Sequence, residues 1–160
     1  MNNHFLLSFL FLFGLSFSVN SFGFDEYLYE DLEPLIVTGE AISWEEFATT
    51  KEDMSCVTYD DGFEDCLIKP IYSDEIKSLD KKEVTLMGFM FPLDPTEMQQ
   101  NFLIGPYPIS CPFTYHVGPS QIVEVKLNKP IEFSFDPVVV KGVFSVEYNK
   151  ETGVFYYLNQ

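Results

Sequence analysis

The chain has 160 residues, of which 46% are hydrophobic and 17% aromatic, enough to fill the core of one folded domain. It carries 25 acidic residues against nine lysines, has no arginine, and has a formal net charge of −16. Because nucleic-acid affinity depends on lysine and arginine neutralising phosphates, this balance argues against nucleic acid and anionic lipid headgroups as partners. Cations, basic protein surfaces and neutral ligands remain.

The first 21 residues have the pattern of a cleavable signal peptide. Residues 5–19 are almost all apolar and uncharged, which suits a signal-peptide core and falls short of the ~20 residues of a membrane-spanning helix. Val19-Asn20-Ser21 suits cleavage after Ser21. Residues 1–4 contain no lysine or arginine, which leaves an uncleaved anchor as the alternative. We therefore expect a periplasmic or secreted protein with no stable membrane insertion after cleavage.

The mature chain is predicted to consist of an acidic N-terminal arm, residues 22–41, and a single β-rich domain, residues 42–160. Ser43-Trp44-Glu45-Glu46 has the form of a capping box at the start of a short helix. Trp44, the only tryptophan, is predicted to be a core anchor. A second short helix is expected over residues 73–79, with Ser73 as its N-cap.

Residues 56–66 have the pattern of a β-hairpin. Asp60-Asp61-Gly62 suits a three-residue loop with Gly62 in the left-handed conformation. In that register Tyr59 faces Phe63, and Cys56 lies opposite Cys66 in a non-hydrogen-bonded pair, close enough for a disulfide. An oxidising compartment favours that bridge. A calcium loop made by the neighbouring carboxylates is the alternative, but their spacing matches no EF-hand.

Five short strands are predicted in the remainder of the chain. They cover residues 84–91, 102–105, 122–127, 138–148 and 154–158. Gly142 lies within the longest strand on its apolar face, where a glycine marks a bend or a close backbone contact. The pattern predicts a mainly β fold, a small OB-like barrel of about five strands with one or two short helices and an N-terminal hairpin, with an open sandwich as the alternative.

Residues 106–121, between the second and third strands, are the segment with candidate chemistry. They contain four prolines, the third cysteine (Cys111) and His116, the only histidine of the mature chain. If the two hairpin cysteines pair, Cys111 is left as a single thiol.

Three interpretations of this pair stay open. Cys111 and His116 are soft ligands suited to zinc or copper, with a carboxylate or another chain completing the site. They also have the residue types of a nucleophile and base, although no third orienting residue stands at a recognisable spacing. In the third interpretation both are structural.

Several motifs of the chain resemble a family of exported bacterial proteins known only as a domain of unknown function. They occur in the order Gly88-Phe89-Met90-Phe91-Pro92-Leu93, Tyr107-Pro108-Ile109-Ser110-Cys111-Pro112-Phe113 and Gly118-Pro119-Ser120-Gln121-Ile122-Val123-Glu124-Val125. The likeness covers about residues 42–158. Many members have a second cysteine where this chain has Thr114, a departure that removes a Cys-x-x-Cys pair and weakens both a redox and a high-affinity metal site.

The resemblance implies a periplasmic, non-enzymatic accessory protein, because members are often encoded beside an ABC-type permease pair and some such gene clusters respond to zinc shortage. We predict a metal site at Cys111 and His116, with Tyr107, Phe113, Thr114 and Gln121 as further binding residues of the loop. A membrane permease or another periplasmic protein is the expected partner. The alternative is a protein-interaction module that docks a membrane complex without metal, and a thiol-dependent enzyme is the third possibility.

Overall fold

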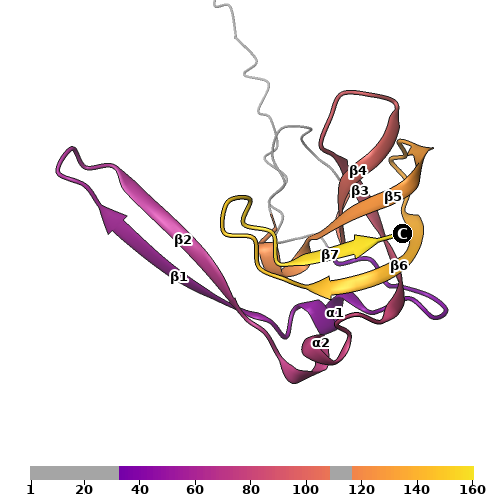
Figure 1. Cartoon of the computed structure of the whole chain (residues 1–160), viewed down its shortest axis with the longest axis horizontal. Coiled ribbons are helices and arrows are strands. Elements are labelled where there is room, and N and C mark those ends of the chain that lie inside the picture. Colours follow the sequence, from indigo (N-terminus) through magenta and orange to yellow (C-terminus); the bar gives the residue numbers. More distant parts are fainter. Residues whose placement is uncertain (1–32, 109–116) are drawn as a thin grey trace, which may run out of the picture.

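Two β-structures, made from separate sets of strands, form the protein: a closed barrel and a hairpin that extends away from it (Figure 1). The structure is a computed structural model, which describes residues 33–108 and 117–160. The predicted arm at residues 22–41 therefore lies mostly outside the described residues, and its boundaries stay a prediction.

The barrel contains five strands, in the order β3-β4-β5-β7-β6, and closes by pairing of β6 with β3. The strands are β3 (Glu83–Pro92), β4 (Met98–Gly105), β5 (Val123–Glu132), β6 (Val138–Val146) and β7 (Tyr156–Asn159). β5 and β7 pair in parallel, and the other neighbours are antiparallel. A 3-10 turn, η2 (Pro119–Gln121), precedes β5. The predicted five-stranded, OB-like barrel with short helices and a hairpin is confirmed.

Alternation along each strand places one set of side chains inside the barrel. Along β3, every second residue from Val84 to Met90 is buried, and the intervening residues are more exposed. Phe102 of β4, Phe144 of β6 and Tyr156 of β7 have no exposed surface and meet in the same core. Burial raises the pKa of the Tyr156 hydroxyl to about 12, so this group is neutral at physiological pH.

Two short helices, α1 (Trp44–Phe47) and α2 (Asp74–Ser78), lie beside the barrel at the point from which the hairpin extends (Figure 1). Ser43 caps α1 by accepting a hydrogen bond from the Glu45 N–H at 3.2 Å. Trp44 is 2% exposed, and its indole N–H donates to the Met87 carbonyl at 2.8 Å, which confirms its predicted place in the core. None of the helices in the described part of the chain combines the length and apolarity needed to cross a bilayer.

Gly142 stands where two strands approach closely. A Cβ atom at this position would lie 2.6 Å from the backbone oxygen of Asn159, on β7. The predicted close backbone contact is therefore confirmed, and the missing side chain lets the end of β7 lie against β6.

Gly142→Ala is expected to destabilise the barrel by about 1–3 kcal/mol, because the new methyl group meets backbone that cannot move aside cheaply. Urea unfolding would measure the change. Val139→Ala, on the same strand but 63% exposed, is the control and is expected to cost less than about 1 kcal/mol. Equal losses in the two variants would contradict the steric argument.

Candidate functional site

The hairpin β1 (Lys51–Thr58) and β2 (Glu64–Ile71) is the one described β-structure outside the barrel. The two strands pair only with each other, and all eight residues of β1 are exposed. A two-stranded ribbon of this kind has too little buried surface to be stable alone in water. Its conformation therefore depends on local cross-links and on the barrel that carries it.

The turn and the disulfide hold the outer part of the hairpin. The Tyr59 N–H donates to the Phe63 carbonyl at 2.8 Å, and Gly62 closes the turn with a φ of +82°, as the sequence predicts. Cys56 and Cys66 are direct partners in the register and form a disulfide with a Cα–Cα distance of 4.0 Å. The predicted register and bridge are confirmed.

Both ends of the hairpin enter the core of the barrel. Phe47 and Thr50, just before β1, are 0% and 4% exposed, and the Phe47 ring lies 5.4 Å from the ring of Tyr156. After β2, the Tyr72 hydroxyl donates to the Phe155 carbonyl at 3.1 Å, and burial raises the pKa of Tyr72 above its usual range. Ile76 of α2 is fully buried. The hairpin is thus anchored at its root on both strands.

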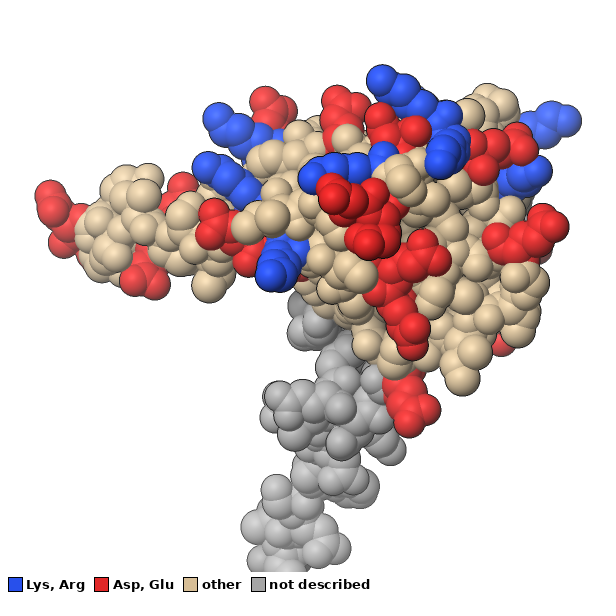
Figure 2. Space-filling model, turned by 90° about the horizontal axis from the view of Figure 1, so that it is seen from below, with Lys and Arg blue, Asp and Glu red and all other residues tan. Residues whose placement is uncertain are grey.

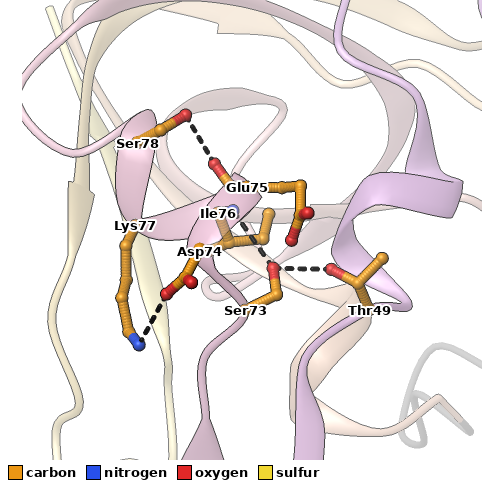
Figure 3. Close-up of polar contacts among 7 residues, drawn as sticks. All are labelled: Thr49, Ser73, Asp74, Glu75, Ile76, Lys77 and Ser78. Atoms are coloured by element: carbon orange, nitrogen blue, oxygen red, sulfur yellow. Dashed lines mark hydrogen bonds and ion pairs between the residues drawn. The ribbon is translucent and has the colours of Figure 1, made fainter.

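Polar contacts join the two sides of this root (Figure 3). The Thr49 hydroxyl, before β1, donates to the Ser73 hydroxyl oxygen, after β2, at 2.8 Å. Ser73 also caps α2 by accepting from the Ile76 N–H at 3.2 Å, as the sequence predicts. On β1, the Glu52 carboxylate accepts from the Ser120 N–H of η2 at 2.9 Å, which links the hairpin to the segment before β5.

The side chains of the hairpin are an unusual mixture of exposed apolar and acidic groups. Met54, Val57, Tyr59, Phe63 and Ile71 are between 51% and 65% exposed. Between Lys51 and Lys69 the sequence contains six acidic residues and no basic one. Figure 2 shows carboxylates at the tip of the hairpin and along it, with uncharged surface between them. Within the described ranges, the ion pairs all lie outside the hairpin.

Both residues predicted to bind metal, and two of the four further predicted binding residues of the loop, lie outside the described residues. Cys111, His116, Phe113 and Thr114 are outside the described residues, so their proximity stays a prediction. Residues 33–108 and 117–160 contain no cluster of three or more side chains suited to hold a metal ion.

The other two predicted binding residues mark the ends of that loop. Tyr107 is partly buried after β4, and Gln121 is partly buried at the end of η2, where its N–H donates to the Gly118 carbonyl at 3.0 Å.

No role was predicted for the exposed apolar residues of the hairpin. The sequence marks these residues by apolar alternation, because Val57, Tyr59 and Phe63 share one face of the predicted register. Alternation identifies an apolar face but does not show whether that face is covered.

The family and structure comparisons identify one group of relatives. The family model DUF3299, described as a protein of unknown function, matches residues 35–158. A crystal structure of a DUF3299 family protein from Pseudomonas aeruginosa PAO1 is similar, with 29% identity and a TM-score of 0.47. That match covers 57% of this chain and 63% of the other, so it spans less than two thirds of the relative. The comparison with curated proteins gives no match.

Removing the disulfide with Cys56→Ala and Cys66→Ala together is expected to loosen the hairpin and leave the barrel folded. The reason is that the bridge joins two strands that bury little surface, whereas the barrel has its own core. Hydrogen exchange would measure this as faster exchange at residues 51–71, with β3–β7 as the internal control. Unchanged exchange in the hairpin, or equal loss of protection in the barrel, would contradict the expectation.

Proposed function

The chain belongs to DUF3299, a family of proteins of unknown function, and we propose from its structure that it is an exported, non-enzymatic binding protein whose β1–β2 hairpin docks onto another protein. The observation that carries this proposal is a covalently closed hairpin, anchored in a barrel, that exposes its apolar side chains. Large exposed apolar patches on a folded protein commonly mark interaction sites.

Export is the second part of the proposal. The signal-peptide pattern of residues 1–21 and the Cys56–Cys66 disulfide support it, because such bridges persist mainly in oxidising compartments. In such a compartment a membrane permease or another periplasmic protein is the partner we propose. The net charge of −16 favours a partner with a basic surface.

The hairpin's contribution is tested by shortening it. Asp53 and Lys69 are direct partners in the register, in a position suited to a two-residue turn, so Asn-Gly can replace residues 54–68. The shortened protein keeps the root contacts of Thr49, Ser73 and Glu52. We expect it to fold and to lose the partner that formaldehyde cross-linking joins to the full chain in the producing cell.

Cross-linked complexes would be compared by mass at matched expression of the two proteins. Substitution of an exposed barrel residue, Lys129→Ala, is the control that keeps the hairpin intact. If the shortened protein forms the same cross-linked complex as the full chain, the hairpin is not the docking element.

Metal handling is the second candidate function, and one observation favours it. The disulfide uses two of the three cysteines, so Cys111 is the one cysteine of the sequence that is not part of that bridge. We propose that Cys111 and His116 bind zinc or copper for a transporter of the ABC type, in line with the gene neighbourhoods that the family resemblance implies.

Metal analysis of the purified mature protein tests this candidate. One equivalent of zinc or copper is expected in the natural protein and in Thr114→Ala, and its loss is expected in both Cys111→Ala and His116→Ala. The natural protein staying metal-free after incubation with zinc, with Cys111 kept reduced, would exclude the site. The result does not bear on the hairpin, since no hairpin residue belongs to the metal candidate.

A further inference from the structure

The register divides the hairpin side chains between two faces. Directly paired residues share a face, and successive residues along a strand alternate. One face carries an apolar row that we call the outer row, made of Val57, Tyr59, Phe63, Leu67 and Ile71. The opposite face carries Met54, the disulfide and Ile68.

The opposite face is the one that meets the barrel. Glu52, on that face, accepts a hydrogen bond from Ser120, and Ile68 packs against the core cluster. The outer row therefore faces away from these contacts. Four of its side chains are 51–62% exposed, and only Leu67 is partly buried.

The outer row is held in place, and Asp53 and Lys69 separate its last member, Ile71, from the other four. The rings of Tyr59 and Phe63 lie 6.1 Å apart across the turn, and the disulfide fixes the strand pairing next to Val57. Aromatic side chains presented on a fixed backbone lose little conformational freedom on binding, so they are effective anchors for a protein partner.

Charge decides which partner suits this row. Asp60, Asp61 and Asp65 lie around its outer end, whereas the two lysines of this face, Lys51 and Lys69, lie at the root of the hairpin. A second copy of this chain would bring another net charge of −16 to the contact, and an anionic membrane would repel the same carboxylates. A protein with lysine and arginine beside an apolar groove complements both features.

We infer that the outer row is the contact face of the hairpin and that its partner is a protein with an apolar groove bordered by basic residues. This inference rests on the proposed docking function and adds the face and the chemistry of the partner. It commits to a protein as the occupant, and lipid or a second copy are outcomes that the experiment separates.

A photoreactive amino acid placed at Phe63 or at Met54 in the full chain, in the producing cell, tests the face. The two positions are 62% and 65% exposed and lie on opposite faces, so they are matched in accessibility. Cross-linking from position 63 to a protein and much less from position 54 is the expected result. A cross-link from position 63 to lipid or to a second copy, or none at all, overturns the inference.

The cross-linked protein, once identified by its mass, is purified and titrated against variants of the full chain. The double variant Tyr59→Ser with Phe63→Ser is expected to bind at least ~10-fold more weakly, whereas Met54→Ser is expected to change binding less than ~2-fold. The double variant Asp60→Asn with Asp61→Asn keeps the oxygen that accepts from the Phe63 N–H. It is expected to weaken binding and to reduce its salt dependence.

These results separate the inference from the docking function. If the shortened hairpin loses its partner but Met54→Ser weakens binding more than the outer-row variant, the face is wrongly assigned and the docking function stands. If affinity does not change with salt or with the aspartate variant, the basic partner is wrong. If the shortened hairpin keeps its partner, the docking function itself fails.

Discussion

The position of the hairpin depends on the aromatic core of the barrel into which both of its ends are packed. Phe47 precedes β1 and contacts the rings of Phe144 and Tyr156, and Tyr72 follows β2 and contacts Phe155 and Tyr156. The segments before β1 and after β2 pack in the same core. The hairpin is therefore attached at two places and cannot rotate relative to the barrel. A ribbon that buries little surface of its own thereby obtains a defined direction from the barrel.

Local chemistry made most of the fold predictable. Gly62 and its two aspartates determine the hairpin turn, Ser43 and Ser73 mark the helix starts, and Gly142 marks the close approach of two strands. The start of β4 was harder to predict: the sequence pattern placed it at residue 102, whereas the strand begins at Met98. The first residues of β4 are mostly polar, yet one of them is buried. Gln99 is 0% exposed, and its side-chain amide donates to the Asp94 carbonyl at 3.2 Å. A buried residue that is polar leaves no apolar alternation to detect.

The interaction face was not predictable in the same way. An apolar alternation such as Val57, Tyr59 and Phe63 has the same pattern whether a second sheet covers it or not. Whether β1 and β2 can join the barrel sheet depends on its edges. The barrel closes with β3 and β6 as neighbours, so it offers no free edge to which these strands can be added. Barrel closure explains why β1 and β2 pair only with each other, and closure is a property of the complete fold.

The exposure of the hairpin explains why a disulfide is found at this position. In most sheets the burial of one face determines the strand register, since a shift of one residue would turn the apolar set toward water. All of β1 is exposed, so burial cannot select its register. The turn at Gly62 and the bridge between Cys56 and Cys66 do so instead, and they place Val57, Tyr59 and Phe63 on one face. The covalent bond thus fixes a surface pattern that the hydrophobic effect does not determine here.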